Sequence, residues 1–187
     1  MRIFIVKSDT AYIDGEEPPF KTGRLDVMLN SAISAITHRN AQGIRRDVEF
    51  FMVMPLNDPP IIHINASKMA RVPINEEDML SLLLDGLRGR EGGVNGMQGS
   101  LDSLITSLQS RGYSPLYLHE DGVPIKSIRP RENMAFILGN QNGMSNSDEY
   151  IMRKRGVRKV SLGPLPYMTW ECVAIINAML DGRILLA

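Results

Sequence analysis

The sequence predicts an α/β fold with a mainly parallel sheet. Short apolar runs, rich in β-branched residues, recur along the chain with the length of buried strands. Segments with apolar residues at helical spacing lie between several of these runs. In the second half the two kinds of segment alternate, which is the order expected for parallel strands joined by helices. With no internal repeat, the chain is expected to form a single domain, residues 1–187.

The first half contains three predicted strands. Each is a short apolar run, and the three are Ile3 to Val6, Val48 to Met54 and Ile61 to Ile64. A polar loop over residues 8–23 follows the first strand. This loop leads into a helix, in which apolar residues recur at helical spacing between Leu25 and Ile36.

Four further helices are predicted from the residues that cap them. Side chains of asparagine, serine and threonine accept hydrogen bonds from free N–H groups at a helix start, and the predicted caps are Asn75, Ser100, Ser145 and Thr169. Six glycines between residues 86 and 99 predict a mobile loop with room for one short strand. The last three strands are predicted at Pro115 to His119, Ala135 to Leu138 and Val157 to Leu162.

The composition narrows the function classes. The 21 lysines and arginines are balanced by 21 aspartates and glutamates, so RNA binding would need a local basic patch. Cys172 is the only cysteine and cannot form an internal disulfide, which fits a reducing compartment. The N-terminal apolar run is too short for a signal peptide, and no stretch reaches the about 20 apolar residues that span a bilayer. A cytoplasmic protein is expected.

Three loops at the expected carboxyl ends of strands are candidates for a ligand site, because α/β folds place ligands there. They cover residues 119–122, 139–143 and 161–166. Their glycines allow close approach to the backbone, and their leucines and prolines supply apolar walls. Taken singly, each loop is more typical of an ordinary turn. The three histidines lack the spacing of metal ligands, so no metal is expected.

The loops are more specific as an ordered set. The chain carries YLHEDG, FILGNQNG and VSLGP in this order, followed by a cysteine in an apolar helix. TGRLD opens the first helix, and IRRD precedes the second strand. This set covers nearly the whole chain and resembles the archaeal tRNA pseudouridine N1-methyltransferase family (TrmY-like) of the SPOUT superfamily. The resemblance implies methylation of N1 of pseudouridine in a tRNA T-loop, with S-adenosylmethionine as the methyl donor.

The resemblance also implies a trefoil knot. Within residues of about 113–187, the last strand, loop and helix would pass through an earlier loop, while residues 1–85 extend the sheet. S-adenosylmethionine would sit bent in the knot, with its adenine held by backbone groups. The cofactor positions carried over by motif are Leu118, Gly139, Leu162, Gly163, Pro164, Leu165, Pro166, Tyr167 and Cys172. We expect Gly139→Val to abolish binding because its side chain would fill space taken by the ligand.

The resemblance further implies a homodimer, in which RNA reaches the cofactor across the interface. It gives Arg24 and Asp26 a catalytic role. Arg45 and Arg46 form a local basic run in a nearly neutral protein and are candidates for contacts with RNA phosphates. From the residues alone, Arg24 and Asp26 are more typical of a surface arginine and a dipole-compensating aspartate. The charged residues 45–47 are likewise typical of a solvated run.

Two positions depart from the family pattern. Asn140 stands where the family has an aspartate after the glycine, and Glu171 stands where it has a histidine before the cysteine. Binding of the cofactor through the backbone tolerates both changes, whereas the choice of substrate need not. Two alternatives therefore stay open: a SPOUT methyltransferase that acts on another nucleotide or RNA, and a catalytically silent knotted RNA-binding module.

Overall fold

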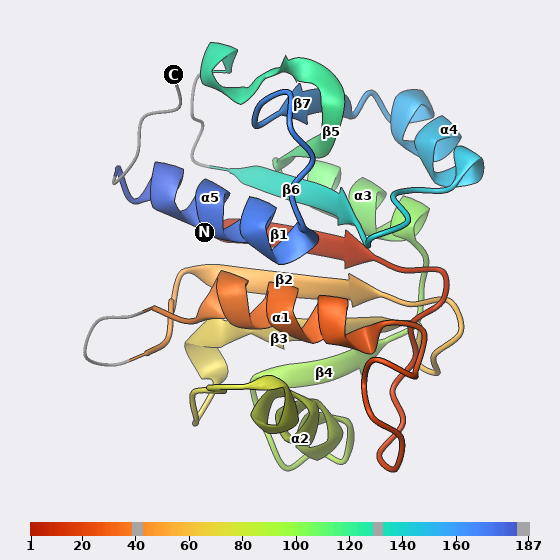
Figure 1. The fold of residues 1–187 in the computed structure, drawn as a ribbon, viewed down its shortest axis with the longest axis vertical. Coiled ribbons are helices and arrows are strands. Elements are labelled where there is room, and N and C mark those ends of the chain that lie inside the picture. The colour runs from red at the N-terminus through yellow and green to blue at the C-terminus, as the bar shows by residue number, and fades with distance from the viewer. Residues whose placement is uncertain (39–42, 129–132, 183–187) are drawn as a thin grey trace.

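The computed structural model describes residues 1–38, 43–128 and 133–182. Its strands form one seven-stranded sheet in the order β4-β3-β2-β1-β6-β5-β7 (Figure 1). The strands are β1 (Arg2–Lys7), β2 (Val48–Val53), β3 (Ile61–Asn65), β4 (Val94–Met97), β5 (Ser114–Pro124), β6 (Met134–Gly139) and β7 (Arg158–Ser161). The strands from β2 to β7 in this order are parallel, whereas β3 is antiparallel to both of its neighbours. The predicted α/β fold with a mainly parallel sheet is confirmed.

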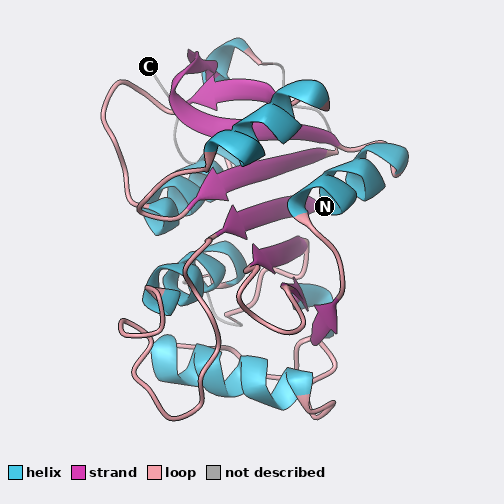
Figure 2. Ribbon diagram, turned by 90° about the vertical axis from the view of Figure 1, so that its right-hand side faces the viewer, coloured by secondary structure: helices cyan, strands magenta, loops and turns pink. Residues whose placement is uncertain are grey.

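Helices cover both faces of the sheet (Figure 2). They are α1 (Leu25–Ile36), α2 (Glu76–Leu87), α3 (Leu101–Ser110), α4 (Asn146–Lys154) and α5 (Thr169–Leu180), with two short 3-10 helices at Ala66–Lys68 and Ile125–Ser127. Successive side chains of β1 point to opposite faces of the sheet, and each face packs against its own layer of helices. Phe4 and Val6 pack with α1, α2 and α5, while Ile3 and Ile5 pack with α3 and α4. The central strands are therefore apolar on both faces, as buried parallel strands are.

Two segments of the sheet differ from a simple strand-and-loop pattern. β4 forms inside the glycine-rich segment and pairs with β3. β5 continues through residues 119–122, which the sequence predicts as a loop, and its pairing with β7 shifts register between Leu118 and Val123. Gly122 permits this close pairing, because a Cβ there would lie 2.3 Å from the carbonyl carbon of Val160. The predicted loop at 119–122 is thus wrong, and this bulged extension of β5 replaces it.

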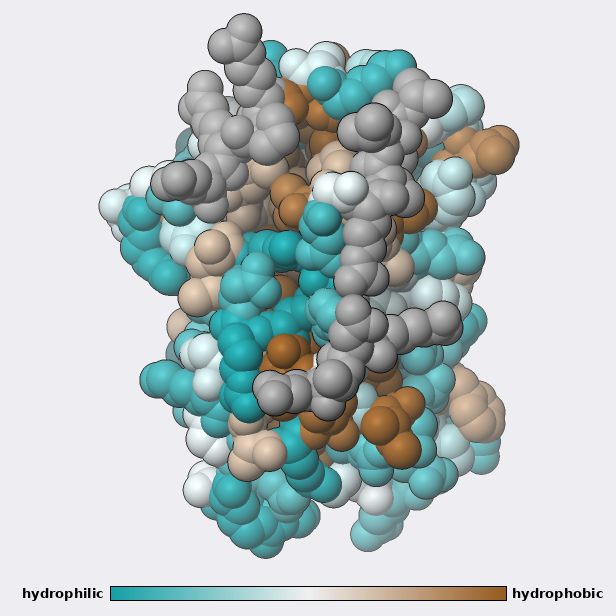
Figure 3. Space-filling view, turned by 90° about the vertical axis from the view of Figure 1, so that its left-hand side faces the viewer, coloured by the Kyte–Doolittle hydropathy of each residue, from teal (hydrophilic) through white to brown (hydrophobic). Residues whose placement is uncertain are grey.

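Charged side chains join the start of β1 to the end of α5. Asp181, the C-cap residue of α5, lies 2.7 Å from Arg2 and 2.8 Å from Arg45. Hydrogen bonds from Arg45 and Arg2 lower the pKa of Asp181 to about 2, although burial acts in the opposite direction. These residues belong to the amino edge of the parallel strands. Figure 3 shows this side of the molecule, where apolar patches are separated by hydrophilic surface.

The helices of the described residues are too short or too polar to cross a membrane.

Candidate functional site

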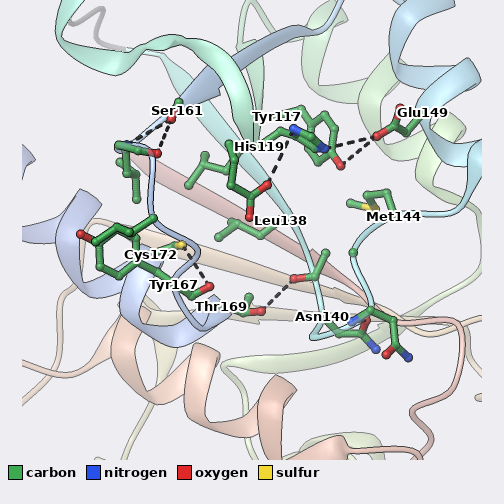
Figure 4. Close-up of a pocket in the computed structure, with 18 residues that line it drawn as sticks. Tyr117, His119, Leu138, Asn140, Met144, Glu149, Ser161, Tyr167, Thr169 and Cys172 are labelled. Atoms are coloured by element: carbon green, nitrogen blue, oxygen red, sulfur yellow. Dashed lines mark hydrogen bonds and ion pairs between the residues drawn. The ribbon is translucent and has the colours of Figure 1, made fainter.

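A cavity of about 270 Å³ lies at the carboxyl edge of the sheet (Figure 4). The end of β5, the segment 138–144 and the segment 161–167 form most of its walls, and the starts of α4 and α5 complete them. Its apolar lining consists mainly of Leu118, Leu138, Leu162, Leu165 and Cys172. Parallel strands end at a common edge, so motifs far apart in the sequence meet here.

Most of the predicted cofactor positions lie around this cavity. The seven that line it are Leu118, Gly139, Leu162, Gly163, Leu165, Tyr167 and Cys172. Pro164 instead lines a neighbouring cavity of about 320 Å³, beside Gly122 and Pro124. Pro166 is exposed and is not among the residues that line either cavity. The structure brings the motifs together, while contact of each residue with a cofactor stays a prediction.

The turn after β6 depends on the missing side chain of Gly139. A Cβ on Gly139 would lie 2.5 Å from the carbonyl carbon of Gly143, across the turn. The N–H of Gly143 closes that turn by donating to the carbonyl of Asn140 at 2.9 Å. The expected reason why a larger residue is not tolerated at position 139, that its side chain would fill the ligand's space, therefore needs correction. The first obstacle to a larger residue is the protein's own backbone and not a ligand.

Asn140 connects this turn to β1. Its Nδ2 donates to Ser8 Oγ at 2.7 Å, and its Oδ1 accepts from the N–H of Asn142 at 2.9 Å. Its backbone N–H donates to the carbonyl of Lys7 at 3.0 Å. Asn140 is buried, with 7% of its surface exposed. Asn140, which replaces the family's aspartate, therefore uses its side chain for hydrogen bonds within the protein.

The start of α5 differs from the prediction. Thr169 is the first residue of the helix, and Met168 occupies the cap position. The hydroxyl of Thr169 donates to the carbonyl of Gly139 at 2.8 Å, which ties α5 to the turn after β6. The backbone N–H of Met168 donates to Glu171 Oε2 at 2.8 Å. Glu171, the second departure from the family pattern, therefore stabilises the helix start.

The wall opposite α5 carries a polar cluster. Glu149 Oε1 lies 3.3 Å from both Tyr117 Oη and Lys159 Nζ, and 3.9 Å from His119 Nε2. Burial, followed by the charge of Glu149, raises the pKa of Tyr117 well above its usual range, so its hydroxyl stays a donor. Burial acts to raise the pKa of Glu149, but hydrogen bonding and charge from Lys159 outweigh it and lower that pKa. The wall therefore presents an ionised carboxylate.

Cys172 faces this cluster from α5. Burial, and then the negative charges of Glu120 and Glu171, raise the pKa of the Cys172 thiol to about 11. The thiol is protonated at neutral pH, so Cys172 serves as part of the cavity wall and not as a nucleophile.

The sequence predicts only part of this polar wall: the candidate segment 119–122 contains His119 and Glu120, but neither Tyr117 nor Glu149 was assigned to the site. Tyr117 lies in the same YLHEDG motif, so the motif itself is the signal that could have found it. Glu149 lies in the first turn of α4, where an acidic residue is typical of helix capping. No local pattern shows that this turn faces β5.

Comparison with known proteins identifies the family. The family described as "Putative SAM-dependent RNA methyltransferase" matches residues 1–184. The chain belongs to this family. A tRNA (pseudouridine(54)-N(1))-methyltransferase from Thermococcus kodakarensis is 32% identical, over 97% of this chain and 100% of that protein. A protein with the same name from Methanococcoides burtonii is 27% identical over 98% of each chain.

Solved structures share the fold of this methyltransferase family member. Nep1 from Archaeoglobus fulgidus, crystallised with S-adenosylhomocysteine, matches with a TM-score of 0.62 and 14% identity over 97% of this chain and 98% of that one. Ribosomal RNA small subunit methyltransferase E from Neisseria gonorrhoeae, bound to S-adenosyl methionine, matches with a TM-score of 0.54 and 16% identity. That match covers 97% of this chain and 66% of the other. The predicted family is confirmed.

The cavity suits the S-adenosylmethionine on which the family depends. Its apolar walls can enclose the adenine ring, and backbone groups of the two glycine-containing loops can hydrogen-bond to it. Gly143 and Gly163 line the cavity with positive φ values of 73° and 152°. No atom lies within 4 Å of the place where a Cβ would stand on either residue. Bare backbone therefore borders open space, as close approach of a ligand requires.

The predicted catalytic pair lies outside this lining. Arg24 immediately precedes α1 with a φ of 66°, and its guanidinium donates to both oxygens of Asp26 at 2.9 to 3.2 Å. These bonds and the charge of Asp26 raise the pKa of Arg24. The structure places the two residues together but does not test their role in methyl transfer.

A hydrogen-bond path connects this pair to the cavity. Ser8 Oγ, which accepts from Asn140, lies 3.4 Å from Thr10 Oγ1. The hydroxyl of Thr10 donates to the carbonyl of Gly23 at 2.9 Å, one residue before Arg24. The turn after β6 and the start of α1 are therefore linked through two hydroxyl groups.

The predicted RNA-binding arginines have partners within the chain. Arg45 makes paired hydrogen bonds with Asp181 at 2.8 and 2.9 Å. Arg46 is exposed, and its guanidinium donates at 3.0 to 3.3 Å to the carbonyls of Ala66, Ser67 and Met69. Their contact with RNA stays a prediction. Within the described part of the chain, no group of three or more histidine, cysteine, aspartate or glutamate side chains could hold a metal ion.

Proposed function

We propose that this protein transfers a methyl group from S-adenosylmethionine to N1 of pseudouridine in the T-loop of tRNA. The observation that carries the proposal is full-length similarity to tRNA (pseudouridine(54)-N(1))-methyltransferases, with 32% identity to the Thermococcus kodakarensis protein. The cavity supports it, because seven positions that the family motifs assign to the cofactor line one space.

The main task of the protein in this reaction is to align the acceptor atom with the methyl group. When bound, S-adenosylmethionine supplies a methyl group that is activated by its sulfonium. The protein must hold the acceptor N1 in line with that methyl group and take up the N1 proton. We assign the proton to the carboxylate of Asp26, and the stabilisation of charge on the ring oxygens to Arg24. Their mutual pairing and the path through Ser8 and Thr10 support this assignment, because both hold the pair in place.

The proposal extends to the whole molecule. The segment from β5 to α5 forms a trefoil knot, and two copies form a cytoplasmic homodimer in which RNA reaches the cofactor across the interface. The return of α5 from the edge strand β7 to pack against α1 supports the knot. The outer face of α5 supports the dimer, since Trp170, Ala174 and Ile175 are partly or fully exposed there.

The acceptor atom is tested with two T-loop transcripts that differ only in having pseudouridine or uridine at one position. We expect a radiolabelled methyl group to enter the pseudouridine transcript alone, because N1 of uridine is bonded to ribose. Equal labelling of both would contradict N1 chemistry and favour another nucleotide atom. Absence of labelling despite tight cofactor binding would indicate a different RNA, and absence of cofactor binding would favour the silent module.

The role of Asp26 is tested by Asp26→Asn. We expect methyl transfer to slow by roughly 10²-fold or more, because the amide cannot take up the N1 proton. The affinity for S-adenosylmethionine in calorimetry should stay the same. Glu17→Gln, an exposed carboxylate on the preceding loop, is the matched control and should keep the full rate. A normal rate in Asp26→Asn would remove the residue from the proposed chemistry.

A further inference from the structure

The charged lining of the cavity has one sign. Its carboxylates are Glu120 and Glu149, and no lysine or arginine is among the described residues that line it. The whole chain, in contrast, has equal numbers of basic and acidic side chains. A local excess of negative charge in a concave site favours a cationic ligand.

The two carboxylates differ in how far their charge is balanced. Glu149 lies 3.3 Å from Lys159, which stands behind it and is not part of the cavity lining. Glu120 has no lysine or arginine within the distance of an ion pair among the described residues, and His119 is its neighbour at 3.8 Å. The charge of Glu120 also acts on Cys172, which lines the cavity from α5. Glu120 is therefore the less balanced of the two carboxylates.

The methyl donor and its product differ in charge at one atom. S-adenosylmethionine carries a sulfonium, an ammonium and a carboxylate, so its net charge is +1. When the methyl group leaves, the sulfur keeps the electron pair of the broken bond and becomes a neutral thioether. S-adenosylhomocysteine therefore has a net charge of zero, with nearly the same shape.

We propose that Glu120, assisted by Glu149, makes the cavity recognise the positive charge of the sulfonium, so that the protein holds S-adenosylmethionine more tightly than S-adenosylhomocysteine. This inference rests on the proposed function, because the cavity must be the cofactor site. Methyl transfer then removes the attraction itself, and the product leaves more readily than the donor.

The test is calorimetry with three ligands: S-adenosylmethionine, S-adenosylhomocysteine and sinefungin. Sinefungin carries an amine-bearing carbon in place of the methylated sulfur and so keeps the positive charge. We expect Glu120→Gln to weaken binding of the two cationic ligands by about fivefold, as for a partly solvated charge pair, and to change the affinity for S-adenosylhomocysteine by less than about twofold. Glu149→Gln should have the same selectivity with a smaller effect, because Lys159 balances that carboxylate.

Asp121→Asn is the matched control. Asp121 follows Glu120 directly, but its side chain is 86% exposed and is not in the cavity lining. It should leave all three affinities unchanged, and thermal unfolding should show that every variant is folded. Equal weakening of all three ligands by Glu120→Gln would mean that the carboxylate shapes the cavity, and would overturn the inference, as would unchanged affinities. Binding of none of the three to the unaltered protein would contradict the proposed function as well.

Discussion

Gly139 and Asn140, side by side at the end of β6, shape the same turn by opposite means. Gly139 contributes the absence of a side chain, and Asn140 contributes four hydrogen bonds within the protein. An aspartate at position 140 would lack the amide N–H that donates to Ser8 Oγ. The neutral asparagine therefore fits its surroundings.

Gly139→Ala tests the turn without adding bulk beyond one methyl group. Because that Cβ would meet the backbone of Gly143, we expect the turn to open, the melting temperature to fall without any ligand, and the affinity for S-adenosylmethionine to drop by roughly tenfold. Gly92→Ala is the control, since a Cβ at Gly92 meets no atom within 4 Å. Loss of affinity with an unchanged melting temperature would instead restore direct collision with the ligand as the explanation.

Helix starts show which features the sequence can predict. Asn75, Ser100 and Ser145 cap their helices as predicted, because their partners lie three residues along the chain. Thr169 offers the same hydroxyl, but that hydroxyl binds Gly139, which is 30 residues away in sequence. A local pattern does not distinguish a capping hydroxyl from one with a tertiary partner. The polar wall at Tyr117 and Glu149 escaped prediction for the same reason.

The end of α5 is expected to depend on pH through Asp181. Its pKa falls from 3.8 to about 2 on folding, so its ion pairs stabilise the fold above about pH 4 and are lost as the pH falls through 2. Asp181→Asn should lower the free energy of unfolding by about 1 to 2 kcal/mol at pH 7, allowing for partial solvent screening. Denaturant unfolding of both proteins should give curves that converge toward pH 2. A constant difference between pH 7 and pH 2 would contradict this account.

The molecule as a whole combines features that sequence patterns predict with others that they do not. The five helices and the strands β1, β2, β3, β6 and β7 lie close to their predicted positions, because each has its own apolar period or cap. β4 was expected only as a short strand somewhere in the glycine-rich segment, and β5 extends beyond its predicted end. The order of the strands in the sheet does not follow from such local patterns, because it depends on which strands pair with each other. β4 pairs only with β3, and β5 extends by pairing with β7. The cavity was predictable through parallel topology, which brings the carboxyl ends of β5, β6 and β7 together.

Assembly is tested at this scale by Ile175→Glu on the outer face of α5. A charge in the centre of the proposed interface should turn a dimer into a monomer of 20.9 kDa in sedimentation at micromolar concentration. Ile74→Glu is the control, because Ile74 is 79% exposed in the segment before α2. A monomer for the unaltered protein, or a dimer that survives Ile175→Glu, would contradict the proposed interface.

The contact between Arg2 and Asp181 places residues from the two ends of the described chain 2.7 Å apart. A circularly permuted protein, in which a linker joins residue 187 to residue 1 and new ends lie in the glycine-rich segment 89–93, would keep every strand and helix of the described residues intact. In such a protein α5 is no longer close to a free end. If a knot forms by threading of that end, the permuted chain must draw the much longer segment that now follows α5 through the same loop, and it should refold far more slowly.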